Sequence, residues 1–216
     1  MYLSRKIRDI PRIMKSTEDK ILRRIYSHGR GWVFTPRHFD DIAGSTNITT
    51  AIQRLHKKGK IRKLARGLYD YPIHDDLLGE LQPSIEAIAK ALSGRDAIRL
   101  QASGAYAANL LGLSTQVPMK VVYLTDGRSR SVVVGNQEIS LKQTSPRMMA
   151  TAGKISGLLI QGLRHIGKNR INDTIIEQLE SRLDEKNKEQ LLKDITYAPA
   201  WIADIFRKLA KQEGQV

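Results

Sequence analysis

The sequence of 216 residues contains no cysteine, so it can form neither disulfide bonds nor zinc sites with thiolate ligands. No apolar run approaches the roughly 20 residues that a membrane-spanning helix needs. The N-terminal residues also lack the long apolar core and cleavage site of a secretory signal. We therefore expect a cytoplasmic protein without a membrane partner.

Signals for catalysis and for bound cofactors are also missing from the sequence. The five histidines form no close pair with the spacing of metal ligands. The chain has no P-loop, no dinucleotide-binding glycine fingerprint after a strand and no nucleophile elbow. We expect a protein that is not an enzyme, with no catalytic residue, no metal site and no cofactor.

Acidic residues are scarce in the first third of the chain, whereas basic residues are abundant there. Residues 1–72 hold 17 Lys/Arg and 6 Asp/Glu, a net charge of +11 out of +14 for the whole chain. Positive charge concentrated in one segment is typical of nucleic-acid binding. A solvated basic surface, or a patch for an acidic lipid or protein, remains the alternative.

Residues 17–72 have the order of elements of a winged helix-turn-helix. A capped helix begins at Thr17, and Thr35-Pro36 starts a second, short helix. Gly44 is a turn residue, and Ser45 is expected to cap a third helix. The turn around Gly67 joins two short basic strands. The predicted elements after the first helix are helices over residues 36–43 and 46–58 and strands over residues 60–64 and 68–71.

The helix predicted over residues 46–58 has two different faces. Ile48, Ile52 and Leu55 fall on one side at helical spacing, which indicates a packed face. The opposite side carries hydroxyl, amide and ammonium groups. These groups belong to Thr46, Thr50, Gln53 and Lys57. A helix with such a polar face fits the major groove of DNA, where every base pair presents its own pattern of donors and acceptors.

The residue types divide into candidates for reading bases and candidates for holding phosphates. The predicted base-reading residues are Thr46, Asn47, Thr49, Thr50 and Gln53. The predicted phosphate and wing residues are Arg37, Arg54, Lys57, Lys58, Lys60, Arg62, Lys63 and Arg66. The alternative is a winged helix that has lost DNA binding and serves as a protein-interaction scaffold. The positive charge and the lack of large exposed apolar residues favour DNA.

The rest of the chain predicts an α+β protein with a helix-rich C-terminal domain and a small antiparallel sheet. We expect a basic N-terminal arm or helix over residues 1–16, a linker over residues 73–83 and a C-terminal domain over residues 84–216. Its predicted strands cover residues 119–125, 130–134 and 137–142. Its predicted helices cover residues 84–92, 101–111, 154–166, 171–183, 185–195 and 199–212.

The C-terminal part carries a second basic set, formed by Arg128, Arg130, Lys142 and Arg147. These residues could extend a DNA-binding surface or engage a partner protein. They could equally be the solvated charges of a sheet edge, which discourage edge-to-edge aggregation.

Four segments resemble the AbiEi antitoxin family. They are VFTPRHFDDIAG, TNITTAIQRLHKKGKI and RKLARGLYDYP in the N-terminal part, and ASGAYAANLLGLSTQVPMKVVYLT further on. The resemblance covers roughly residues 17–145 and implies an antitoxin of a toxin–antitoxin pair whose toxin is a nucleotidyltransferase. It implies repression of its own promoter through inverted repeats in double-stranded DNA, with residues 46–58 as recognition helix and residues 60–71 as wing. A stand-alone transcriptional regulator is the alternative, and the oligomeric state stays open.

Overall fold

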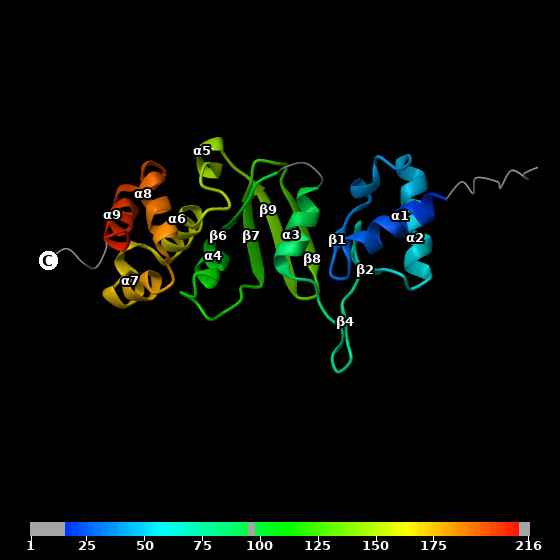
Figure 1. Ribbon diagram of the computed structural model, residues 1–216, viewed down its shortest axis with the longest axis horizontal. Helices are drawn as coiled ribbons and strands as arrows, with labels where there is room; N and C mark the ends of the chain where they lie inside the picture. Colours follow the sequence, from blue (N-terminus) through cyan, green and yellow to red (C-terminus); the bar gives the residue numbers. More distant parts are fainter. Residues whose placement is uncertain (1–15, 95–97, 212–216) are drawn as a thin grey trace, which may run out of the picture.

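The computed structural model describes residues 16–94 and 98–211. The protein is elongated, with three groups of elements in a row along its long axis (Figure 1). N-terminal elements form one end, a four-stranded sheet lies in the middle, and C-terminal helices form the other end. Each group has its own cluster of buried apolar side chains. The predicted N-terminal arm lies outside the described residues except for Ser16.

Three helical elements and three strands make up the N-terminal unit. The first helix starts at a capping box, because the Ser16 hydroxyl accepts a hydrogen bond from the Asp19 amide and the Asp19 carboxylate accepts one from the Ser16 amide. The small sheet is antiparallel with the order β1-β3-β2. The elements are α1 (Thr17–His28), β1 (Val33–Phe34), η1 (Pro36–Phe39), α2 (Ser45–Lys57), β2 (Arg62–Ala65) and β3 (Leu68–Asp70).

Two local predictions for this unit were wrong in detail. The short helix predicted over residues 36–43 is a single 3-10 turn, η1, followed by a non-helical turn. The predicted cap of α2, Ser45, is its first helical residue, and the extended residue before it is Gly44. Glycine is tolerated at the position before a helix, so the start moves by one residue without loss of the element.

A β-hairpin stands where a linker was predicted over residues 73–83. Its strands are β4 (His74–Asp75) and β5 (Gly79–Glu80), and it projects from the side of the molecule (Figure 1). The Asp75 carboxylate accepts hydrogen bonds from the amides of Leu77 and Leu78, each 2.9 Å long, and so holds the tip. The tip leaves Leu77 94% exposed.

The middle of the molecule is a mixed sheet with the strand order β6-β7-β9-β8. One side packs on α3, whose start is capped by the Ser84 side chain. Its elements are α3 (Ile85–Ser93), β6 (Leu100–Ser103), α4 (Gly104–Leu110), β7 (Lys120–Thr125), β8 (Arg130–Val134), β9 (Gln137–Gln143) and α5 (Pro146–Met149). The three predicted strands are therefore confirmed.

The sheet differs from prediction in one pairing and one strand. β7 and β9 run parallel, so the sheet is not purely antiparallel. Burial explains why β9, rather than β8, pairs with β7. Ile139 and Leu141 of β9 are 0% and 3% exposed, which suits a strand with a neighbouring strand on each side, whereas no residue of β8 is buried. The tight turn at Gly135 then leaves β8 at the edge. The helix predicted over residues 101–111 begins only at Gly104, because the preceding residues pair with β7.

The C-terminal helices form a bundle against the sheet. The helices are α6 (Ile155–Ile166), α7 (Asp173–Glu180), α8 (Glu185–Lys193) and α9 (Ala200–Leu209), with 3-10 turns η2 (Lys168–Arg170) and η3 (Ile195–Tyr197). α6 packs on α4 and β6. All four predicted helices are present and each is shorter than predicted, most of all α7, which ends at Glu180 instead of residue 183 and begins at Asp173 instead of residue 171. This bundle has a separate core, so the predicted C-terminal domain contains two hydrophobic clusters.

The hydrophobic core continues across the boundary that was predicted near residue 73. Val33 of β1 and Leu68 of β3 belong to the same buried cluster as Ile88 and Leu92 of α3. The N-terminal unit is therefore attached to the middle of the molecule by apolar packing as well as by the chain.

Two glycines of α6 provide a test of this packing. A methyl group at Gly157 would overlap the main-chain oxygen of Thr151, and a main-chain atom cannot turn away. A methyl group at Gly162 would meet the Leu111 side chain at 2.5 Å, and that side chain can change its conformation. Alanine gains at most about 1 kcal/mol over glycine in a helix, whereas overpacking costs about 1–3 kcal/mol. We expect Gly157→Ala to lower the free energy of unfolding by about 2 kcal/mol and Gly162→Ala by clearly less. Urea unfolding measures both, and equal losses would contradict the packing described.

Candidate nucleic-acid interface

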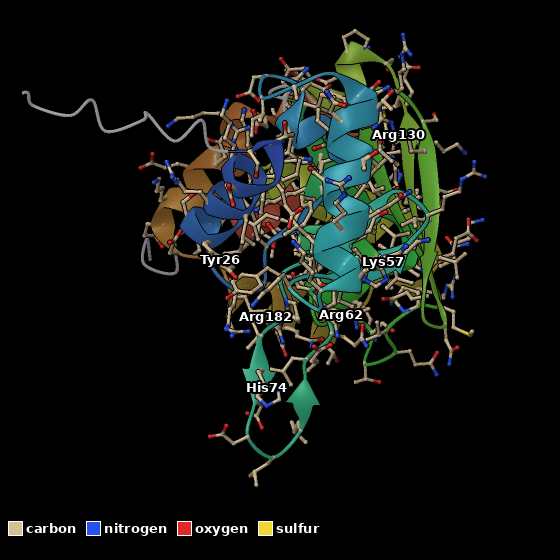
Figure 2. The ribbon with its side chains drawn as sticks, turned by 90° about the vertical axis from the view of Figure 1, so that its right-hand side faces the viewer. Tyr26, Lys57, Arg62, His74, Arg130 and Arg182 are labelled. Atoms are coloured by element: carbon tan, nitrogen blue, oxygen red, sulfur yellow. The ribbon has the colours of Figure 1, made fainter. Side chains whose placement is uncertain are left out.

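The outward face of α2 is polar and uncovered. The side chains of Ile48, Ile52 and Leu55 are at most 1% exposed and point into the N-terminal core. Figure 2 looks onto this end of the molecule, with α2 lying across the face nearest the viewer. The exposed residues of α2 include all five predicted base readers: Thr46, Asn47, Thr49, Thr50 and Gln53. The predicted split of the helix into a packed face and a polar face is thus confirmed.

Polar contacts fix α2 relative to the elements behind it. Lys58, just after α2, forms an ion pair with Glu18 of α1. Arg24 of α1 bonds the Asp41 carboxylate at 2.6 Å and the His38 carbonyl oxygen at 2.7 Å, which anchors the turn before α2. Lys58, predicted as a phosphate contact, is therefore partly neutralised.

Thr49 is also partly engaged. Its hydroxyl donates a hydrogen bond of 2.9 Å to the Ser45 carbonyl oxygen inside the helix. Only its acceptor capacity is then free for a base or phosphate. Thr46, Asn47, Thr50 and Gln53 carry most of the hydrogen-bonding capacity of this face.

The β2–β3 ribbon presents positive charge beside α2. Gly67, with φ of +74°, makes its tight turn. Lys60, Lys63 and Arg66 are exposed, as are Arg54 and Lys57 at the end of α2. The structure therefore brings together on one end of the protein five of the predicted phosphate contacts.

Arg62 does not belong to this exposed set. Its Nη2 lies 2.6 Å from Asp70 Oδ2 and 2.8 Å from the Leu81 carbonyl oxygen, and its Nε lies 3.1 Å from Asp70 Oδ1. Glu80 of β5 is within 3.4 Å. Arg62 was predicted as a phosphate contact, and in the structure the buried Asp70 carboxylate holds its guanidinium.

Burial decides the electrostatics of this pair. Burial raises the pKa of Asp70 above its ordinary value, and the Arg62 hydrogen bond offsets only part of that rise. The same hydrogen bond raises the pKa of Arg62. An acid whose folded-state pKa is raised stabilises the fold below its unfolded pKa and loses that contribution as pH rises through its folded pKa. Arg62 therefore limits the cost of an ionised Asp70 at neutral pH.

Asp70 is the ion-pair partner of Arg62, and composition and periodicity did not predict it. The register of the ribbon would have revealed it, because Asp70 lies directly opposite Arg62 in the antiparallel pairing of β2 and β3. Opposite charges in directly facing positions stabilise a strand pair. Glu80 could not have been found in this way, since the hairpin that carries it was predicted as a linker.

The second basic set borders three hollows. Arg128 and Arg130 line a hollow of about 920 Å³ together with Arg37 of the N-terminal unit. Arg130 also lines a second hollow on the sheet, together with Lys142 and Lys120. Arg147 borders a third hollow beside Arg164 of α6. Arg130 therefore lies between Arg128 and Lys142, while Arg147 stands apart from the other three.

Neither a metal site nor a membrane-spanning helix is found in residues 16–94 and 98–211. In that part of the chain, no group of three or more His, Asp or Glu side chains is arranged to hold a metal ion. None of the helices described has the length and apolar character needed to cross a membrane.

The family model of DUF6088, a family of unknown function, matches residues 20–191. The chain belongs to the DUF6088 family. The matched range runs from α1 into α8 and so includes α2, the β2–β3 ribbon, the projecting hairpin and the mixed sheet. No curated protein matches the chain.

The Arg62–Asp70 pair gives a test of its structural role. In Arg62→Gln, Asp70 stays buried without its cation, so we expect the free energy of unfolding at pH 7 to fall by about 2–4 kcal/mol. The loss should shrink near pH 5, because an unpaired buried Asp70 takes up a proton more readily. Urea unfolding at both pH values measures this. Lys63→Gln, an exposed neighbour, should change stability by less than about 0.5 kcal/mol. A loss that does not depend on pH would contradict the assignment.

Proposed function

We propose that this DUF6088 protein binds double-stranded DNA through an N-terminal winged helix-turn-helix. In this proposal α2 is the recognition helix and the β2–β3 ribbon is the wing. The order of elements and the sheet order β1-β3-β2 support this fold assignment. The observation that carries the proposal is the uncovered polar face of α2 beside exposed lysines and arginines.

The chemistry of that face suits the major groove. Gln53 can offer a donor and an acceptor to adenine, and threonine can contact either a base edge or the thymine methyl group. Residues in the N-terminal half of a recognition helix usually contact base edges, which here are Thr46, Asn47 and Thr50. Lys57, Lys63 and Arg66 would meet phosphates, which supply affinity and orientation rather than sequence preference.

A role as a protein-interaction scaffold is less well supported at this face. The large apolar side chains that are exposed in the described part of the chain lie elsewhere, and none belongs to α2 or to the β2–β3 ribbon. The fully buried centre of a protein–protein interface is depleted in charged residues, whereas this end of the molecule is rich in cations. The face therefore resembles a nucleic-acid interface more closely.

The resemblance to the AbiEi family supports a biological role. We propose that the protein is an antitoxin that represses its own promoter through inverted repeats and neutralises a nucleotidyltransferase-type toxin. In this role α2 would read each half of the repeat, and the C-terminal elements would contribute to neutralisation. A stand-alone transcriptional regulator is the alternative.

Gln53 provides the sharpest test of DNA reading. Duplexes are first selected from a random pool with the wild-type protein and then measured with Gln53→Ala. We expect relaxed preference at one base position, at a cost of about 1–3 kcal/mol for the preferred sequence. An equal loss on all sequences would mean that Gln53 does not contact a base.

A wing variant serves as the matched comparison. Lys63 and Arg66 changed together to alanine should weaken binding to every duplex alike. The slope of log K against log salt should fall by about 1.8, or about 0.9 for each phosphate that the variant no longer neutralises. An unchanged slope would remove the ribbon from the interface, whatever Gln53 does.

The antitoxin role is tested in cells. Expression of the adjacent gene product alone should arrest growth, and co-expression of the wild-type protein should restore it. The Gln53→Ala variant should still restore growth when expressed from a foreign promoter, if neutralisation does not depend on promoter binding. A neighbouring gene without toxicity would favour the stand-alone regulator.

A further inference from the structure

A hollow of about 920 Å³ lies where the N-terminal unit meets the mixed sheet. η1 and the residue after it contribute Arg37 and Asp40, the end of α3 contributes Ser93 and Gly94, and Ile98 precedes β6. The remaining lining residues come from the turn between β7 and β8 and from the start of β8. Arg128 and Arg130 come from that last segment. Among the residues that the structure describes, the hollow thus gathers three arginines from parts of the chain about 90 residues apart, and one acid, Asp40.

The three arginines have no carboxylate partner among the described residues. The ion pairs of that part of the chain involve other arginines and lysines, and Asp40 lines the hollow without pairing to Arg37, Arg128 or Arg130. Arg130 is half-buried, whereas Arg37 and Arg128 are exposed. The cluster therefore places three guanidinium groups around one hollow without a carboxylate partner among the described residues.

Arg130 is held in position. Its Nη1 donates a hydrogen bond of 3.0 Å to the Leu92 carbonyl oxygen at the end of α3. Burial lowers the pKa of Arg130 from its ordinary value, and the nearby charges of Arg37 and Arg128 lower it further. Like charges held this close destabilise the folded protein unless an anion lies between them.

We propose that this hollow binds a phosphate-bearing anion, with Arg37, Arg128 and Arg130 as the groups that hold its phosphates. The planar guanidinium fork matches the oxygens of phosphate and can donate two parallel hydrogen bonds. The net charge of +2 from three arginines and Asp40 balances the charge of about −1.5 to −2 that one phosphate monoester carries at pH 7. The volume exceeds that of a single phosphate and lies in the range of small-molecule sites, so a larger phosphorylated group also fits.

Two sources of such phosphates fit the position. Arg37 belongs to the turn just before α2, and Figure 2 places Arg130 on the same side of α2 as Lys57. The backbone of a duplex bound at α2 could therefore pass over the hollow. A free phosphorylated small molecule could instead bridge the N-terminal unit and the sheet. The site itself does not require that α2 reads DNA.

The test uses the full-length protein and inorganic pyrophosphate as probe. Calorimetric titration at constant ionic strength should show binding that weakens at least about tenfold in Arg37→Gln and Arg128→Gln. Asp40→Asn should tighten it by roughly twofold to fivefold, because it removes a negative charge from the lining of the hollow. Arg147→Gln makes the same change of charge outside the hollow and should leave binding unaltered. Thermal unfolding without ligand checks that each variant is folded.

A second measurement separates the two sources. The salt dependence of affinity for a mixed-sequence duplex of about 30 base pairs is compared between wild type and Arg128→Gln. A slope smaller by about 0.9 assigns the phosphate to the DNA backbone. An unchanged slope together with abolished pyrophosphate binding assigns it to a free phosphorylated molecule. If Arg37→Gln and Arg128→Gln match the wild type with both probes, the proposal is wrong. Should the wild type bind no duplex, the pyrophosphate titration still decides the question.

Discussion

The burial of one side of α2 is the constraint on which the rest of this interface depends. Ile48, Ile52 and Leu55 are packed in the N-terminal core, and burial of each such side chain contributes about 1.5–3 kcal/mol. Rotation of the helix by half a turn would expose all three and bury two threonine hydroxyls and a lysine. That change would cost several kcal/mol, so the polar face has no alternative but to face solvent. The chemistry offered to a partner is therefore set by the core behind it.

The β2–β3 ribbon depends on a second interaction of a different kind. Arg62 joins β2 to Asp70 of β3 and to Leu81 at the base of the projecting hairpin. One side chain thus ties the ribbon to the chain that leads into α3. Neighbouring residues alternate in direction along a strand, so Lys63 is left outward when Arg62 turns inward. The same alternation that forms the internal ion pair also places a cation on the outer side.

The sequence predicted most N-terminal elements and three of the four strands of the sheet, because their signals are local. Periodicity identified the buried side of α2, and the strands predicted over residues 130–134 and 137–142 are β8 and β9. Pairing between distant segments was not accessible in the same way. The parallel contact of β7 with β9 depends on which strand is buried on both sides, and this is decided by packing on α3. The extended residues before Gly104 were predicted as helix, because small residues are compatible with a helix. In the structure their backbone groups instead form hydrogen bonds with β7.

The same distinction applies to the charges. A count of basic residues predicted that the first third of the chain is positively charged. It could not distinguish Arg62, which forms an ion pair with the buried Asp70, from Lys63, which is exposed. Nor could it show that Arg37 would lie with Arg128 and Arg130, because the packing of Val33 and Leu68 on α3 brings the two parts of the chain together. Apolar packing therefore positions charges that repel one another. The hollow exists only while the N-terminal unit stays packed on the sheet, because Arg37 comes from one side of that contact and Arg128 and Arg130 from the other. The apolar junction of Val33 and Leu68 with α3 therefore determines the geometry of this cluster, just as the core behind α2 determines the direction of its polar face.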